Sequence, residues 1–262
     1  MPNLFELKSL VNLKYVHKQY LKVINKHRNP KYWKHMPCPI CHTSSSTIAL
    51  IIDHIRYDSC PECKCIYNAI QLTIDMDMLY DSYRDRLVKP SQKLRWQLGV
   101  NKYKQIAEHC TSKGRILDVG CGSGQMCQIF RNNGWKALGV DPCINVKYED
   151  FDTNQQFDCI TFMGVLEHIN NPMELLRKAI GMLKNNGLIV IEVPSADCLL
   201  TQYLRDNVFS PYRYIEHCRH LSFWSKHTIA YICDILNLKV VDIKTIGFDL
   251  QTIMLSDNPL LT

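Results

Sequence analysis

The chain has 262 residues, of which 46% are hydrophobic, and a formal net charge of +6. This length and composition suit one α/β domain with a buried core and a small additional unit. There is no apolar run long enough to cross a bilayer and no secretory signal, so we expect a soluble cytoplasmic protein without a transmembrane segment. The thirteen cysteines are scattered through predicted strands, helices and loops, which argues against a disulfide scaffold and indicates reduced, mostly buried thiols.

The N-terminal segment carries the basic charge, because residues 1–35 contain eight Lys or Arg residues and Glu6 as their one acidic residue. The rest of the chain is close to neutral and offers no electrostatic footprint for a phosphate backbone, so nucleic acid is not an expected partner. Apolar residues recur at spacings near three, four and seven, which predicts a basic amphipathic helix within residues 1–35. Its apolar face is open to three interpretations: packing on the main domain, packing on a second subunit in a homo-oligomer, or docking on an acidic membrane surface or partner.

Two Cys-x-x-Cys motifs follow, Cys38-Pro-Ile-Cys41 and Cys60-Pro-Glu-Cys63, with 18 residues between them. This spacing allows four thiolates to converge tetrahedrally on one Zn²⁺. Short strands at 46–53 and 55–59 complete the pattern of a zinc ribbon, which we place at residues 36–70. The predicted ligands of this structural metal are Cys38, Cys41, Cys60 and Cys63. Cys65 is an alternative to Cys63, and a redox role for the pairs is the alternative to metal binding.

Residues 71–112 are polar and compatible with one or two helices, and we predict a helical linker there. Residues 113–262 then alternate in the βαβ manner, which predicts an α/β domain. The expected strands lie at 115–119, 136–140, 157–162, 187–193, 238–245 and 249–255, and the expected helices at about 124–133, 172–183 and 226–236. A parallel crossover needs a dozen or more residues, but only residues 142–145 separate the second strand from a candidate third strand at 146–148. We therefore predict that the usual helix after the second strand is missing and that the edge strand is short or absent.

The α/β domain opens with a glycine-rich turn, Asp118-Val-Gly-Cys-Gly-Ser-Gly124, directly after an apolar strand. Glycines without Cβ atoms let the backbone approach a bulky ligand, and the helix that begins near Gln125 turns free N–H groups towards it. Asp141 ends the next strand, where a carboxylate is well placed for ribose hydroxyls. Asp118 would repel an anionic dinucleotide pyrophosphate, whereas it would attract a sulfonium cofactor with an amino group. The pattern therefore favours S-adenosylmethionine.

Three runs, at residues 116–125, 139–142 and 157–168, together resemble the class I S-adenosylmethionine-dependent methyltransferases. The resemblance covers residues 114–255 and implies a Rossmann-like sheet with helices on both faces. It places Asp118 at the amino-acid end of the donor, Asp141 on the ribose, and Asp150 or Phe151 against the adenine. The full donor set that it implies is Asp118, Gly120, Cys121, Gly122, Gly124, Asp141, Pro142, Asp150, Phe151, Met163 and Gly164. A Rossmann-like domain that binds no methyl donor is the alternative.

Two segments of the sequence bear on which molecule accepts the methyl group. After the fourth strand the chain reads Met163-Gly-Val-Leu-Glu-His168, which lacks the Asn-Pro-Pro-Tyr or Asp-Pro-Pro-Tyr of base-amine methyltransferases and resembles small-molecule, sugar and ubiquinone-type enzymes. Residues 212–225 resemble a His-Leu-Ser-Tyr-Phe-Ser segment of zinc-ribbon methyltransferases that act on nucleotide sugars. That resemblance makes His220 the candidate general base, with His217 and His168 as alternates, and each is otherwise interpreted as a structural histidine. Cys218-Arg219 stands where C-methylating relatives have His-Glu, which argues against C-methylation.

The sequence thus predicts an S-adenosylmethionine-dependent O-methyltransferase with an N-terminal zinc ribbon. The expected acceptor is a sugar, nucleotide sugar, glycan precursor or similar polar small molecule. An RNA methyltransferase is the alternative enzyme, since zinc ribbons and a basic N-terminal segment also suit nucleic acid. A non-catalytic scaffold that only binds the cofactor is the alternative of another class.

Overall fold

The computed structural model describes residues 22, 25–26, 29–52, 55–72, 92–110, 113–142, 148, 151, 154–197 and 220–244. The chain divides into two compact units. The sheet unit comprises residues 90–194 and 232–241, and the ribbon unit comprises residues 1–89, 195–231 and 242–262. Almost all of the expected N-terminal helix, most of residues 143–150 and the expected strand at 249–255 lie outside the described residues.

In the described part of the sheet unit, four parallel strands lie in the order β7-β6-β8-β9. The central strands β6 (Arg115–Val119) and β8 (Phe157–Met163) are flanked by β7 (Lys136–Val140) and β9 (Leu183–Glu192). Ile116, Leu117 and Ile160 on the central strands are fully buried, as expected for strands covered on both faces. The predicted strands are confirmed here, with β9 beginning four residues earlier than expected.

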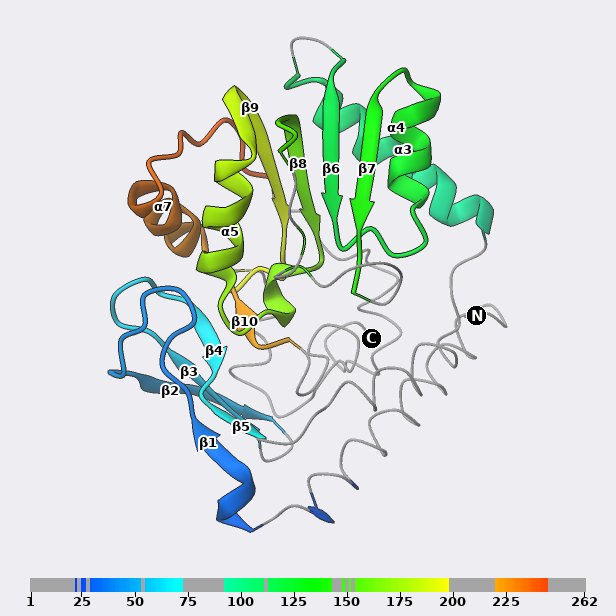
Figure 1. The fold of residues 1–262 in the computed structure, drawn as a ribbon. Helices are drawn as coiled ribbons and strands as arrows, with labels where there is room; N and C mark the ends of the chain where they lie inside the picture. Colours follow the sequence, from blue (N-terminus) through cyan, green and yellow to red (C-terminus); the bar gives the residue numbers. More distant parts are fainter. Residues whose placement is uncertain are drawn as a thin grey trace, which may run out of the picture. The chain divides into compact units, whose positions relative to one another are not determined.

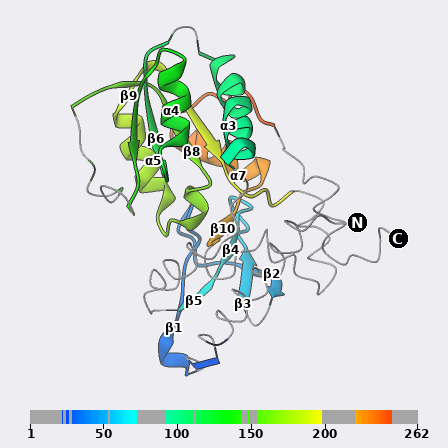
Figure 2. The same ribbon diagram turned by 90° about the vertical axis from the view of Figure 1, so that its right-hand side faces the viewer.

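Helices cover both faces of this sheet, which confirms the predicted Rossmann-like architecture. Figures 1 and 2 show α3 (Gln92–Ala107) and α4 (Gln125–Asn132) on one face and α5 (Pro172–Gly181) on the other. An aromatic cluster joins α3 to α4, because the Phe130 ring makes edge contacts with Tyr103 and Trp135 at centroid distances of 5.1 and 5.4 Å. The 3-10 helix η2 (Leu166–His168) follows β8, and α7 (Lys226–Ile235) divides between the two units after Tyr231.

The strand expected at 238–245 is wrong over its described part, residues 238–244, which have no regular secondary structure. Val240, Val241 and Ile243 are exposed there. Their β-propensity is insufficient by itself, because a strand needs a neighbouring strand and a surface to pack on. Among the described residues the sheet ends at β9. No helix in the described part of the chain has the length and apolarity needed to cross a membrane.

The described residues of the ribbon unit form two antiparallel sheets. One has four strands in the order β10-β4-β3-β2, formed by Ser222–Phe223, Ile66–Asn68, Ile55–Ser59 and Thr47–Ile52. The other pairs β1 (Trp33–His35), which follows the 3-10 helix η1 (Pro30–Tyr32), with β5 (Ile70–Leu72). In Figure 1, β10 in orange lies beside β4 in cyan. The segment that carries β10 follows β9 in the chain, and the sequence had placed it in the domain at 113–262.

Candidate functional site

The glycine-rich turn after β6 has the backbone geometry that its sequence predicts. Gly120, Gly122 and Gly124 all have positive φ, at 80°, 51° and 74°, in the region that favours glycine. A Cβ on Gly120 would overlap the Val165 side chain, whereas a Cβ on Gly122 or Gly124 would meet nothing within 4 Å. The first glycine is therefore needed for packing, and the other two leave open space beside the backbone.

Three hydrogen bonds fix this turn against the end of β7, one of them from the Cys121 N–H to the Val140 carbonyl at 3.2 Å. The Gly120 N–H donates to the Val140 carbonyl at 2.8 Å, and the Gly122 N–H donates to Oδ2 of Asp141 at 2.9 Å. The structure thus brings the predicted ribose ligand Asp141 directly to the glycine-rich turn. Helix α4 begins at Gln125 immediately after Gly124, which supplies no side-chain cap. The glycine-rich turn is therefore bordered by both the N-terminal N–H groups of α4 and the Asp141 carboxylate.

Asp118, at the end of β6, is a buried carboxylate with 3% of its surface exposed. The Thr161 hydroxyl donates to its Oδ1 at 2.7 Å, and the Cys127 thiol lies 3.9 Å from its Oδ2. Burial raises the pKa of Asp118 to about 6, although the Thr161 hydrogen bond and the charge of Lys102 act in the opposite direction. A buried carboxylate that is ionised at neutral pH is stabilised by a cationic ligand.

Packing beneath the turn involves Cys121, which the sequence placed in the donor set, and three residues that it left unassigned, namely Gly139, Cys127 and Thr161. A Cβ on Gly139 would lie 2.7 Å from the Cys121 sulfur and 2.9 Å from the Cys127 sulfur. Burial raises the pKa values of these thiols to about 11 for Cys121 and about 12 for Cys127. Both thiols therefore remain neutral near pH 7 and act as packing groups. The signal for Thr161 was available, because it is a polar residue within the apolar part of β8, residues 159–163.

The structure describes most of the other residues that were predicted to bind the methyl donor. Met163 ends β8, and Gly164 follows it with a φ of 68°. Pro142 is exposed and Phe151 is half-buried, whereas Asp150 lies outside the described residues. Tyr148 was not predicted, but its hydroxyl lies 3.3 Å from the Cβ position of Gly120 and thus beside the glycine-rich turn.

The candidate general bases lie in different units. His168 ends η2 in the sheet unit, with its Nε2 4.0 Å from Oε1 of the buried Glu167. His220 belongs to the ribbon unit, is 9% exposed, and makes an edge contact with Phe223 at a centroid distance of 6.0 Å. His217 lies outside the described residues.

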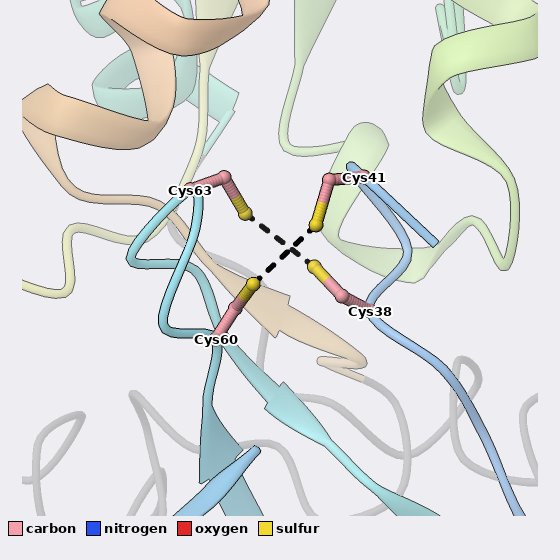
Figure 3. A group of neighbouring side chains, drawn as sticks. All are labelled: Cys38, Cys41, Cys60 and Cys63. Atoms are coloured by element: carbon pink, nitrogen blue, oxygen red, sulfur yellow. Dashed lines mark hydrogen bonds between the residues drawn. The ribbon is translucent and has the colours of Figure 1, made fainter. Parts of the chain in front are cut away.

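The four cysteines of the two Cys-x-x-Cys motifs converge on a common centre, as Figure 3 shows. Their sulfur atoms all lie within 4.8 Å of one another, with 3.4 Å between Cys38 and Cys63 and 3.4 Å between Cys41 and Cys60. A disulfide requires about 2 Å between sulfurs, whereas a tetrahedral Zn²⁺ with bonds of about 2.3 Å places them roughly 3.8 Å apart. The geometry therefore fits a tetrahedral metal site.

The two cysteine turns repeat the same backbone conformation. The first cysteine of each motif donates its N–H to the carbonyl five residues later, at 3.0 Å from Cys38 to Thr43 and 2.9 Å from Cys60 to Cys65. His42 and Lys64, each four residues after that cysteine, have φ of 59° and 58°. Cys65 itself is outside the cluster, because its buried thiol donates to the Ile66 and Phe223 carbonyls at 3.6 Å. Within the described residues Cys63 completes the cluster.

A parallel sheet whose first strand leads into a three-glycine turn, with a carboxylate at the end of the second strand, defines the class of Rossmann-like nucleotide-cofactor domains. A sequence profile described as a methyltransferase domain matches residues 81–243. This match covers more than half of the chain, and the chain therefore belongs to the methyltransferase domain family.

Curated relatives match the chain over part of their length. A ubiquinone biosynthesis O-methyltransferase from Rhodopseudomonas palustris strain TIE-1 is 28% identical over 102 residues, which cover 31% of this chain and 40% of the relative. The corresponding protein of Bradyrhizobium diazoefficiens is 30% identical over 105 residues, covering 32% of this chain and 41% of the relative. The chain thus spans about two fifths of the length of these relatives. Among solved structures, the plantazolicin methyltransferase BpumL in complex with SAH is 18% identical with a TM-score of 0.47, and the match covers 72% of this chain and 84% of that chain.

Proposed function

We propose that the protein is an S-adenosylmethionine-dependent O-methyltransferase that acts on a hydroxyl of a sugar, nucleotide sugar, glycan precursor or similar polar small molecule. The observation that carries the donor part is the glycine-rich turn, in which the Gly122 N–H binds the Asp141 carboxylate and the turn leads directly into α4. Membership of the methyltransferase domain family supports the same reaction class.

The described residues suit the chemical groups of this donor. Asp141 is oriented by Gly122 at the turn and accepts hydrogen bonds from ribose hydroxyls. The N–H groups at the start of α4 favour the carboxylate of an amino-acid group. Asp118, buried but mostly ionised at neutral pH, favours the positive charge of the donor's amino group. S-adenosylmethionine supplies a methyl group on a sulfonium, which is a good leaving group.

Methyl transfer requires an aligned nucleophile, and a hydroxyl acceptor benefits from a base that removes its proton. We assign that role to His220, because a neutral imidazole can accept a proton at physiological pH. The names of the curated relatives, ubiquinone biosynthesis O-methyltransferases, support transfer to oxygen. The sugar-like acceptor rests on the likeness of residues 212–225 to the corresponding segment of nucleotide-sugar enzymes.

We further propose a structural Zn²⁺ held by Cys38, Cys41, Cys60 and Cys63. Four thiols from two identical turns fill a tetrahedral site and leave no position open for a reacting molecule. Three of these cysteines are buried and Cys41 is half-buried, which suits a structural site more than a catalytic one.

The proposal is tested by incubating the zinc-loaded protein with S-adenosylmethionine and a panel of nucleotide sugars, simple glycosides, phenols and tRNA. Mass spectrometry would measure S-adenosylhomocysteine and the methylated product. Turnover with a sugar substrate would support the proposed acceptor class. A signal with tRNA alone would overturn that class and leave the methyl donor intact, and donor binding without turnover on any member would favour a scaffold.

A further inference from the structure

The segment that carries His220 is built into the ribbon sheet. β10 pairs with β4 in an antiparallel register, with Ser222 opposite Tyr67 and Phe223 opposite Ile66. The Asn68 N–H donates to the Leu221 carbonyl at 2.9 Å, which extends this pairing to the residue next to His220. The Phe223 ring in turn makes an edge contact with Tyr57 on β3, at a centroid distance of 5.7 Å. The backbone on the C-terminal side of His220 is therefore held by ribbon strands.

Helix α7 begins directly after this segment, and its first turn is capped by a reciprocal pair of hydrogen bonds. The Thr228 N–H donates to the Ser225 hydroxyl at 3.0 Å, and the Ser225 N–H donates to the Thr228 hydroxyl at 3.2 Å. This is a capping box with threonine in the position where glutamate is usual. Because the two hydroxyl oxygens lie 2.9 Å apart, one hydroxyl also donates to the other.

The Thr228 hydroxyl makes a further bond that reaches the cysteine cluster. It donates to the carbonyl of Cys63 at 2.9 Å, and both residues are fully buried. A hydroxyl has one proton, so Thr228 uses its proton on Cys63 and the proton between the two hydroxyls belongs to Ser225. In Figure 3 the pale orange ribbon of residues 220–235 passes beside Cys63. His227 adds a second contact to this turn, with its Nε2 3.3 Å from the Glu62 carbonyl.

We propose that Thr228 is a positioning residue that couples the four-cysteine metal site to the segment carrying His220. A metal bound by Cys60 and Cys63 fixes the backbone of the second cysteine turn, which presents the Cys63 carbonyl to Thr228. Thr228 then holds Ser225 and the start of α7, and thereby the C-terminal end of the segment 220–225. This inference rests on the proposed function for two points, namely the metal and the role of His220.

Three variants separate this coupling from general stability. Thr228→Val keeps the side-chain shape but removes the bond to Cys63, and Thr228→Ser restores a hydroxyl. Ser225→Ala is the matched control, because it weakens the cap of α7 without removing the Thr228 bond to Cys63. The readouts are zinc transfer to a chromogenic chelator and amide hydrogen exchange of residues 220–228, both measured on the full-length zinc-loaded protein.

We expect Thr228→Val to accelerate zinc transfer and the exchange of residues 220–228 by about tenfold each, since the buried hydrogen bond to Cys63 is lost together with the two bonds that the Thr228 hydroxyl accepts from Ser225. Thr228→Ser should remain near the wild type, and Ser225→Ala should release zinc at nearly the wild-type rate. Equal acceleration of zinc transfer by Thr228→Val and Ser225→Ala would overturn the proposal, because it would show a general loss of stability. Unchanged zinc transfer in Thr228→Val would also overturn it.

A second measurement needs no variant and covers the case in which Thr228→Val does not fold. Zinc is removed from the wild-type protein with a chelator, and exchange is compared at residues 220–228 and at β6. Faster exchange at 220–228 with unchanged exchange at β6 would support the coupling, and unchanged exchange at both would overturn it. Metal analysis of the wild type comes first, because a zinc-free protein overturns both the metal assignment and the coupling. If the protein contains zinc but transfers no methyl group, the proposed function is overturned. The hydrogen-exchange measurements still test the coupling in that case.

Discussion

The sheet unit and the ribbon unit differ in what holds them together. In the sheet unit, Ile116, Leu117 and Ile160 are fully buried between helices on two faces. The ribbon unit has short strands of two to six residues around a cluster of four thiols. We therefore infer that burial of apolar side chains stabilises the first unit, whereas the proposed zinc would supply much of the folding free energy of the second.

Metal removal should have the largest effect, and it should act on the ribbon unit alone. Structural zinc sites contribute on the order of 10 kcal/mol to folding, so Cys60→Ser or a chelator should unfold the ribbon unit and leave the parallel sheet intact. Hydrogen exchange mapped onto the two units would measure the difference. Cys233→Ser is the matched control, because Cys233 is a half-buried thiol outside the cluster. Cooperative unfolding of both units on zinc removal would contradict this account.

Asp118→Asn should raise the stability of the ligand-free protein at neutral pH and lower its affinity for the methyl donor. The folded pKa of about 6 lies above the ordinary 3.8, so between these values the folded protein keeps a proton that the unfolded chain has lost. The free energy of unfolding of the ligand-free protein therefore falls as pH rises from about 4 to about 6. This loss of unfolding free energy is about 3 kcal/mol at 1.36 kcal/mol per pKa unit. Chemical denaturation of the wild type and of Asp118→Asn across this pH range measures it.

The same carboxylate should be needed for the donor. Calorimetric titration with S-adenosylmethionine should show affinity rising with pH through about 6 in the wild type, and a loss of about tenfold or more in Asp118→Asn at pH 7. Asp158→Asn is the control, because Asp158 lies near the start of β8 and accepts from the Arg115 N–H and from Lys184. Equal affinity in Asp118→Asn and the wild type would remove Asp118 from the donor site.

His220→Ala tests the contribution of the ribbon unit to the reaction. Loss of a general base should lower turnover by about 10² or more with little change in donor affinity. His168→Ala, in the sheet unit, is the competing assignment, and His109→Ala is an exposed control on the same unit. A larger loss in His168→Ala than in His220→Ala would move the base to the sheet unit.

Alanine substitutions at two glycines of the glycine-rich turn should distinguish a glycine needed for packing from one that leaves room for the donor. Gly120→Ala introduces a methyl group that overlaps Val165, so it should destabilise the sheet unit by a few kcal/mol. Gly122→Ala meets nothing within 4 Å and should cost only about 1 kcal/mol for a left-handed backbone. Its main effect should be weaker donor binding, and thermal unfolding with calorimetry of both variants would measure this. Undiminished donor affinity in Gly122→Ala would show that the open space is not used.

Sequence patterns were most informative where structure depends on contacts between neighbouring residues. β6 and β7 lie at the predicted residues, because the apolar run of β6 ends at Gly120 and that of β7 ends at Asp141. Both of these residues also belong to the predicted donor site. The four cysteines converge as their spacing predicts. β1, β4, β5 and β10 were missed, because two or three residues are too few to show a periodicity. The link from Thr228 to Cys63 was also not predictable, since these residues are 165 positions apart and no pattern in either segment signals the other.

We propose that the sheet unit binds the methyl donor, whereas methyl transfer also depends on the ribbon unit and its proposed zinc. This proposal is tested most directly by measuring S-adenosylmethionine affinity and S-adenosylhomocysteine formation on the same protein before and after zinc removal, with the sugar acceptor identified by the panel. We expect donor affinity to be retained and methyl transfer to be lost. Full methyl transfer by the zinc-free protein, or loss of donor affinity together with the metal, would contradict it.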